Sequence, residues 1–167
     1  MRVYLPATVP MLRTLLDEGQ LSPKSGIAFA LTPMLRESYA AGDTEELEYA
    51  AMMEAARASL RLLSAELEAD PEAMPRRAVV AADLDGVALR PDLDDAAVTL
   101  PGPVTVRAVA AVHVDVSEAE PAVRTAAGVV DAADLGDPDA EFALGDAEDH
   151  EMAWYATQEL SFLLELM

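Results

Sequence analysis

The chain contains no cysteine. This absence excludes disulfide bonds, thiolate nucleophiles and thiolate metal ligands together. It also fits a reducing cell interior, where disulfides are rare. Long apolar runs are missing as well. No segment approaches the ~20 apolar residues that a membrane-spanning helix requires, and residues 1–6 contain no uninterrupted apolar signal core. We therefore expect a cytoplasmic protein with no membrane partner.

Positive charge is scarce. The sequence has 11 Lys and Arg residues against 31 Asp and Glu residues, which gives a formal net charge of −20. Residues 125–167 hold 11 carboxylates and no lysine or arginine. Such a surface repels nucleic acid and anionic lipid and attracts cations or basic protein surfaces. We therefore expect a protein partner or self-association and no nucleic-acid partner. A nucleic-acid mimic that occupies a DNA-binding protein is a further possibility.

Aromatic residues are few, at 5%, but 52% of all residues are hydrophobic and the mean hydropathy is +0.15. This apolar content is enough to offset the conformational entropy of a folded chain. The core must consist mainly of Ala, Val, Leu and Met. A chain of this length fits one α+β domain spanning 1–167, because one core can bury roughly 70% of the unfolded surface.

The hydrophobic pattern predicts the elements of the fold. Strands are expected at 2–7, 27–31, 78–82 and 104–116, with a short edge strand at 141–144. Helices are expected between Thr8 and Gly19 and at 44–69, 118–130 and 148–166, with an acidic loop at 131–140.

The helix at 44–69 has the clearest signals. Asp43 is a natural N-cap, and Glu46 stands three residues later as its capping-box partner. Apolar residues at spacings of four and three predict one buried stripe, which consists of Tyr49, Met53, Ala56, Leu60, Leu63 and Leu67. Such a stripe is typical of core contact, and a helix that zips to a partner is the alternative.

Without the first helix and two of the short strands, the order is strand, helix, strand, strand, helix, strand. This order predicts a ferredoxin-like sandwich, with a mainly antiparallel sheet, helices on one face and an added C-terminal helix. A sheet of this kind leaves one face open. A homodimer that covers this face is therefore expected.

The segment 145–151 concentrates four carboxylates and one histidine at the start of the predicted C-terminal helix. Asp146, Asp149 and His150 could together hold magnesium, manganese or iron. The alternative is that these acidic residues simply favour the positive end of the helix dipole.

Two other segments carry a possible chemistry. The stretch from Asp83 to Gly86 resembles the nucleophile motif of haloacid-dehalogenase-type phosphatases. Those enzymes need a lysine between this motif and their metal-binding loop, and this sequence has none there. The alternative is that Asp85-Gly86 forms a tight turn. His113 and Asp115 could pair as a base and its orienting partner on one strand face, or His113 can be structural.

Trp154 and Tyr155 lie on the predicted C-terminal helix. They are candidate partner-binding residues if both rings are exposed. The alternative is that at least one ring fills the space between helix and sheet.

Three stretches carry a family resemblance: 1–8, 46–51 together with 55–63, and 142–151 together with Trp154 and Tyr155. They resemble an uncharacterised actinobacterial family of acidic, Ala-rich proteins, catalogued as a domain of unknown function. The resemblance implies a bacterial cytoplasmic protein and transfers no catalytic residue. The sequence contains no complete catalytic set and no cofactor motif. We therefore expect a non-catalytic protein-interaction or regulatory module, with a divalent-metal-dependent enzyme or small-molecule binder at the 146–151 cluster as the alternative.

Overall fold

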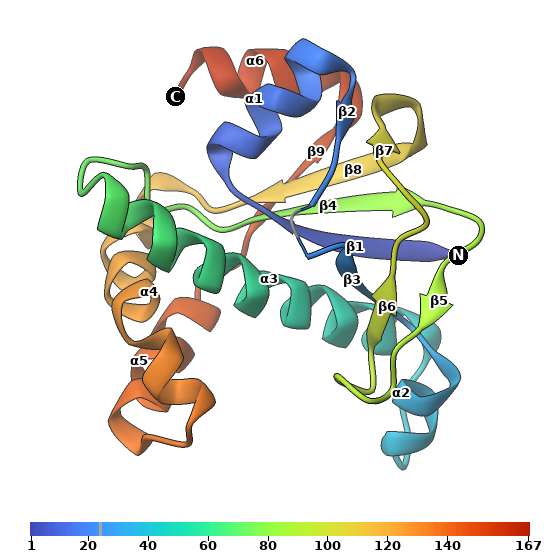
Figure 1. Cartoon of the computed structure of the whole chain (residues 1–167). Coiled ribbons are helices and arrows are strands. Elements are labelled where there is room, and N and C mark those ends of the chain that lie inside the picture. Colours follow the sequence, from blue (N-terminus) through green and yellow to red (C-terminus); the bar gives the residue numbers. More distant parts are fainter. Residues whose placement is uncertain (24) are drawn as a thin grey trace.

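A computed structural model describes residues 1–23 and 25–167. Within these residues the chain forms α-helices, 3-10 helices and β-strands (Figure 1). The strands are β1 (Arg2–Ala7), β2 (Gln20–Leu21), β3 (Ile27–Ala30), β4 (Ala78–Asp83), β5 (Ala88–Leu89), β6 (Ala97–Thr99), β7 (Val104–Thr105), β8 (Val109–Val114) and β9 (Ala153–Ala156). The α-helices are α1 (Val9–Glu18), α2 (Pro33–Ser38), α3 (Thr44–Ala69), α4 (Glu120–Asp134), α5 (Pro138–Glu148) and α6 (Leu160–Glu165).

Seven strands form one antiparallel sheet in the order β5-β6-β3-β1-β4-β8-β9, and β2 pairs with β7 in a separate ribbon. The predicted α+β class with an antiparallel sheet is confirmed. One split βαβ unit is present, because β3 and β4 flank β1 and are joined through α2 and α3. A second unit is not formed, because β8 and β9 pair directly and antiparallel.

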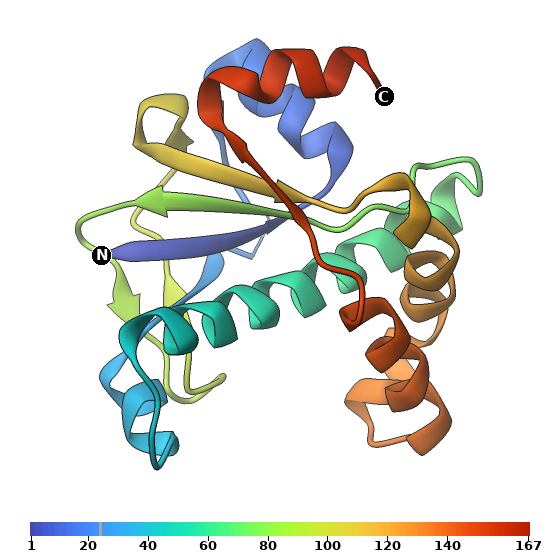
Figure 2. The same ribbon diagram turned by 180° about the vertical axis from the view of Figure 1, so that it is seen from behind.

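Helices cover both faces of the sheet (Figures 1 and 2). Alternation along β1 sends Val3 and Leu5 to one face, where they pack with α1 and α6, and Tyr4 to the other face, where α3 lies. The prediction that helices, apart from the C-terminal one, lie on one face was therefore wrong for α1. The sheet face that would have favoured a homodimer is covered.

The bounds predicted for α3 are confirmed, and Asp43 Oδ1 accepts a hydrogen bond of 2.8 Å from the Glu46 backbone nitrogen. The predicted buried stripe was only partly right, because Tyr49 is 53% exposed. The buried residues of α3 are Leu47, Ala51, Met52, Ala55, Ala56, Ser59, Leu60 and Leu63. The small residues among them let the helix approach the sheet closely. The sequence prediction missed these residues because it was based on large apolar side chains.

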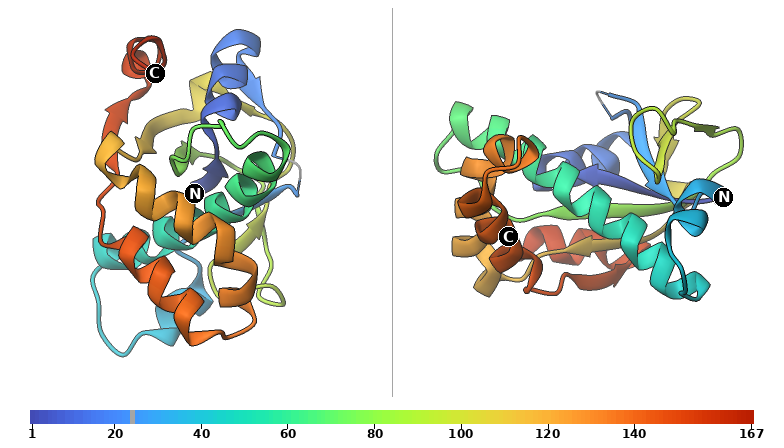
Figure 3. Two further views of the ribbon diagram at one scale, coloured as in Figure 1. Left: turned by 90° about the vertical axis from the view of Figure 1, so that its left-hand side faces the viewer. Right: turned by 90° about the horizontal axis from the view of Figure 1, so that it is seen from below.

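The C-terminal half of α3 has a second set of neighbours. Leu60 and Leu63 pack against α4 and α5, which form a helical layer of their own beside the sheet (Figure 3). In the view from below, α3 lies in front of the sheet and reaches α4, so it contacts both layers (Figure 3). Among the described residues, none of the helices combines the length and the apolar character needed to span a lipid bilayer.

The single strand predicted at 104–116 was wrong. The structure divides it into β7, a 3-10 turn at Val106–Ala108, and β8. The division is needed because β7 pairs with β2 outside the main sheet whereas β8 pairs with β4 inside it.

The C-terminal predictions also required correction. The loop predicted at 131–140 contains the end of α4 and the start of α5, and the strand predicted at 141–144 lies within α5. Ala140, Leu144 and Ala147 are buried at helical spacing against α4. The helix predicted at 148–166 is instead a loop, strand β9, a 3-10 turn and the short helix α6.

Candidate protein-binding site at the β9 edge

Strand β9 is the last strand of the seven-stranded sheet, and its inner side pairs with β8. No other strand in the described part of the chain pairs with its outer side. An edge strand offers unpaired backbone N–H and C=O groups, to which an additional strand can bind. One of these groups is already bonded, because the Ala156 backbone nitrogen donates to Glu159 Oε1 at 3.0 Å. The rest of the β9 edge is a surface on which an extended segment can add to the sheet.

Trp154 and Tyr155 lie on this strand, and their side chains point to opposite faces of the sheet. Trp154 is 60% exposed and lies opposite His113 of β8. Tyr155 is half-buried against the core cluster shared with α1 and α6. The prediction that both residues lie on a helix was wrong, because 154 and 155 alternate as strand residues. Only Trp154 presents its ring as an exposed anchor.

A shallow pocket of about 250 Å³ lies beside Trp154, between α3 and the edge of the sheet. It is lined by aromatic, methionine and histidine side chains and by one carboxylate; the lining residues are Tyr49, Met52, Met53, His113, His150, Glu151, Met152 and Trp154. Methionine side chains adapt to differently shaped apolar groups. The pocket can therefore take one apolar side chain of a segment bound at β9.

A buried ion pair fixes the chain just before β9. Arg77 and Asp115 are each 1% exposed, and their side chains form two hydrogen bonds of 2.8 and 2.9 Å. The Arg77 backbone nitrogen also donates to Asp115, at 2.7 Å. Arg77 Nη2 donates a further bond of 3.0 Å to the His150 carbonyl oxygen. This pair therefore holds the loop between α5 and β9 and positions one wall of the pocket.

The Arg77–Asp115 ion pair argues against the hypothesis that His113 and Asp115 act as a base and its orienting partner. Both carboxylate oxygens of Asp115 accept hydrogen bonds from the Arg77 guanidinium. Asp115 is therefore the partner of Arg77 and does not orient His113. His113 is half-buried, and burial lowers the pKa of its imidazole, with a smaller lowering from the positive charge of Arg2. His113 is therefore held toward its neutral form in the lining of this pocket.

Sequence reasoning singled out Asp115 as a partner of His113, and it missed Arg77 and the pairing of Arg77 with Asp115. The signal was present, because each residue stands next to an apolar strand, Arg77 before β4 and Asp115 after β8. Once Ala78 is paired with Val114, the residues at 77 and 115 must lie side by side. The pairing of the two strands, which one sequence does not reveal, was the missing information.

The candidate metal ligands lie at the end of α5 and not at the start of a helix. Asp146 lies in the last turn of α5, Asp149 is its C-cap, and His150 follows it. The helix-dipole argument for their acidity was therefore wrong, because carboxylates at a helix C-terminus meet its negative end. The described residues contain no group of three or more His, Asp or Glu side chains that could hold a metal ion. Metal binding at Asp146, Asp149 and His150 stays a prediction.

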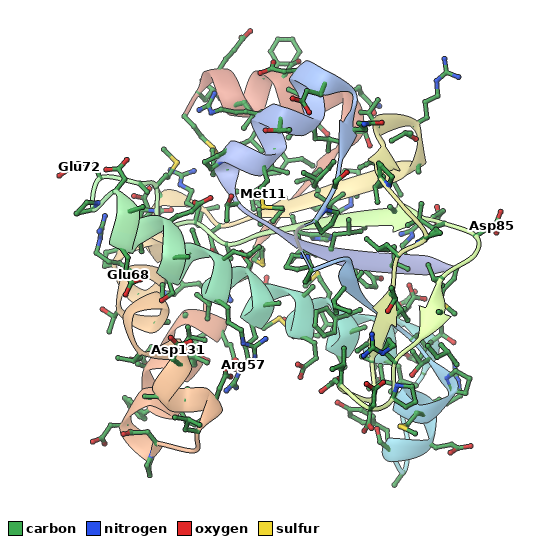
Figure 4. The ribbon with its side chains drawn as sticks, in the orientation of Figure 1. Met11, Arg57, Glu68, Glu72, Asp85 and Asp131 are labelled. Atoms are coloured by element: carbon green, nitrogen blue, oxygen red, sulfur yellow. The ribbon has the colours of Figure 1, made fainter. Side chains whose placement is uncertain are left out.

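The stretch from Asp83 to Gly86 forms the turn between β4 and β5. Asp83 accepts hydrogen bonds from Arg2, and the bond from the Arg2 guanidinium, at 2.8 Å, lowers the pKa of the Asp83 carboxyl. Asp85 is exposed at the tip of the turn (Figure 4), and Gly86 has φ +76°. Asp85 and Gly86 therefore bend the chain between β4 and β5, which agrees with the interpretation of this motif as a turn.

Charge is distributed unevenly around the β9 edge. On the α3 and α4 side, Asp134 accepts hydrogen bonds from Arg61 at 2.7 Å and from Arg57 at 3.0 Å, and these bonds lower the pKa of its carboxyl. By contrast, Glu148, Asp149 and Glu151, which immediately precede β9, form no ion pair within the described part of the chain. The surface that leads into β9 is negative and uncompensated.

The fold and this edge together define an α+β protein with an antiparallel sheet, helices on both faces and one open acidic edge. A family model described as "Family of unknown function (DUF6912)" matches residues 1–164, and the chain belongs to this family. No curated protein and no solved structure matches the chain. The predicted resemblance to a family of unknown function is thus confirmed, and its actinobacterial origin stays a prediction.

Proposed function

We propose that this protein is a non-catalytic protein-binding module that takes an extended, basic segment of a partner protein onto strand β9. The main support is the combination of an open edge strand with a ring, Trp154, that is 60% exposed beside a concave pocket. Backbone groups of β9 supply hydrogen bonds to the added strand, and the pocket beside Trp154 receives one of its side chains. A large exposed aromatic ring at such a position is typical of an interface hot spot.

The charge of the site selects the partner. Residues 125–167, which include β9 and its approaches, have 11 carboxylates and no lysine or arginine. A segment with lysine or arginine on alternate positions would place positive charge near Glu148, Asp149 and Glu151. Electrostatic attraction of this kind raises association rates and rejects acidic competitors.

Self-association is the competing occupant of the same edge. Two copies could pair β9 with β9, but each copy brings a formal charge of −20 and an acidic edge. This repulsion disfavours the pairing. A homodimer and a cytoplasmic location stay predictions, and the oligomeric state can be read from sedimentation equilibrium.

The experiment uses Trp154, the only tryptophan of the chain, as the probe. The ligand is a synthetic peptide that alternates lysine with valine and has one central leucine. Glutamate replaces lysine in one control peptide, and proline replaces valine in a second. Indole emission shifts to shorter wavelength when water is displaced. We expect this shift with the lysine–valine peptide only.

Two variants assign the binding to the site. We expect Trp154→Ala to weaken binding of the lysine–valine peptide, measured by calorimetry, by roughly thirtyfold, as for a hot-spot residue of about 2 kcal/mol. Phe162→Ala is the matched control, because Phe162 is 69% exposed on α6, which packs on the opposite face of the sheet. Equal losses in both variants, or equal binding of all three peptides, would contradict the proposal.

A further inference from the structure

A second cavity lies away from β9. It has a volume of about 420 Å³ and is bounded by α1, by β2 with Ser22, Pro23 and Ser25, and by the C-terminal half of α3. This volume is within the range of small-molecule sites, and at ~30 Å³ per water it exceeds the space of one ion or one water many times. Its apolar lining is supplied by Pro6, Met11, Leu21, Leu62 and Ala65.

One carboxylate in this cavity is incompletely bonded. Glu66 Oε1 accepts a hydrogen bond of 2.6 Å from the hydroxyl of Thr8, which is fully buried. Glu66 Oε2 is also shielded from solvent, but it has no hydrogen-bond partner among the described residues. It is the only buried side-chain oxygen or nitrogen of that part of the chain without a partner. A buried carboxylate oxygen in this state is costly unless a donor reaches it.

We infer that this cavity is a binding site for a small aliphatic amine, whose ammonium group donates to Glu66 and whose hydrocarbon chain lies against the apolar lining. The ammonium group supplies the positive charge that balances the Glu66 carboxylate, and it donates to Oε2 when this side chain turns toward the cavity. The apolar chain is covered by Met11 of α1, drawn in Figure 4, and by Leu62 of α3.

Other ligand classes fit less well. An anion would be repelled by Glu66 and by Glu18, which also lines the cavity. A divalent metal ion requires several oxygen ligands at once, and no such group is formed by the described residues. A neutral apolar molecule would leave the Glu66 carboxylate without a donor. An amine with a short hydrocarbon chain satisfies both the charge and the apolar lining.

The test compares hexylammonium, hexanol and hexanoate as probes, with binding measured by calorimetry and by amide NMR shifts. Hydrogen bonds to charged groups contribute about 10- to 100-fold in affinity. We therefore expect hexylammonium to bind at least about tenfold more tightly than hexanol, and hexanoate not to bind. The shifted amides should belong to α1, β2 and the second half of α3.

Glu66→Gln keeps the shape of the side chain and an oxygen for the Thr8 hydroxyl, and it should abolish the preference for the amine. Glu68→Gln removes one charge from an exposed position on the same helix (Figure 4) and should keep that preference. Circular dichroism checks that both variants fold. An amine preference that survives Glu66→Gln, or equal affinity for amine and alcohol, would overturn the inference.

A third variant, Lys24→Ala, removes the only lysine, so that no side-chain ammonium competes with the probe. We expect the wild type and Lys24→Ala to bind hexylammonium equally. Binding by the Lys24→Ala variant alone would show that the chain itself supplies the cation, and it would overturn a site for a free amine. The absence of binding by either protein would do the same.

Discussion

At the scale of single residues, the feature that most directly shapes the β9 site is the Arg77–Asp115 ion pair. Both side chains are almost completely buried, and together they hold the strand β4, the end of β8 and the loop before β9. A buried pair of this kind adds little stability over a well-packed apolar pair, but removal of one partner leaves a buried charge without compensation. Its main effect is therefore to fix one arrangement of the chain.

Asp115→Ala tests this interpretation. We expect the free energy of unfolding, measured by urea denaturation, to fall by about 3–5 kcal/mol. The matched control is Asp92→Ala, which removes a bidentate partner of Arg90 at an exposed position. The control should leave the free energy of unfolding almost unchanged, because a solvent-exposed ion pair adds little stability. Similar losses in the two variants would contradict the role assigned to Arg77 and Asp115.

His113 gives a prediction on pH. Burial lowers the pKa of its imidazole below its ordinary value of 6.5, so that as the pH falls the unfolded chain binds a proton before the folded chain does. The contribution of His113 to the free energy of unfolding is therefore complete above the pKa that this residue has in the unfolded chain. It is lost as the pH falls below that value and through the lower pKa of the folded protein. We expect the free energy of unfolding to decrease less in His113→Gln than in the wild type between about pH 7 and about pH 5. Parallel pH profiles would show that His113 does not contribute.

At the scale of elements, α3 shows which local signals in the sequence were sufficient. Its cap at Asp43 and its length follow from residue types close in sequence, and both were predicted correctly. Its buried face was predicted less well, because Ala51, Ala55 and Ser59 contact the sheet and carry little hydrophobic signal. Strand β9 was missed because four residues, 153–156, give no period long enough to distinguish a strand from a helix.

Ser59 joins α3 to the sheet. Its hydroxyl donates to the Ala7 carbonyl oxygen at 2.7 Å and accepts from the Ala78 backbone nitrogen at 3.2 Å. Ser59→Ala leaves both backbone groups without this partner in a buried place. We expect it to lower the free energy of unfolding, measured by urea denaturation, by about 1–3 kcal/mol. Ser64→Ala, at a partly exposed position on the same helix, should have an effect within about 0.5 kcal/mol. Equal effects would contradict the role of Ser59.

At the scale of the whole molecule, composition predicted the acidic surface and the aliphatic interior but could not place the candidate site. Trp154, His113 and Tyr49 come from three distant parts of the sequence, and only the strand order brings them to one pocket. The predicted acidic cluster contributes to this pocket through His150 and Glu151 and to the edge through its charge. Its proposed role thus changes from metal ligation to attraction of a basic segment.

The net charge of −20 should make salt act in opposite directions on folding and on binding. Added sodium chloride screens the repulsion among carboxylates and should raise the Tm in a thermal scan. The same screening should weaken binding of the lysine–valine peptide, measured by calorimetry across the same salt series. Peptide affinity that is independent of salt would contradict the electrostatic part of the proposed recognition.

Amide hydrogen exchange on the intact protein tests the central claim most directly, because it reports backbone hydrogen bonds residue by residue. On addition of the lysine–valine peptide, we expect slower exchange of amides in β9, with little change in the opposite edge strand β5. This result would show that the peptide is added to the sheet as a strand. Peptide binding with unchanged exchange in β9, or with equal protection of β5, would contradict the account.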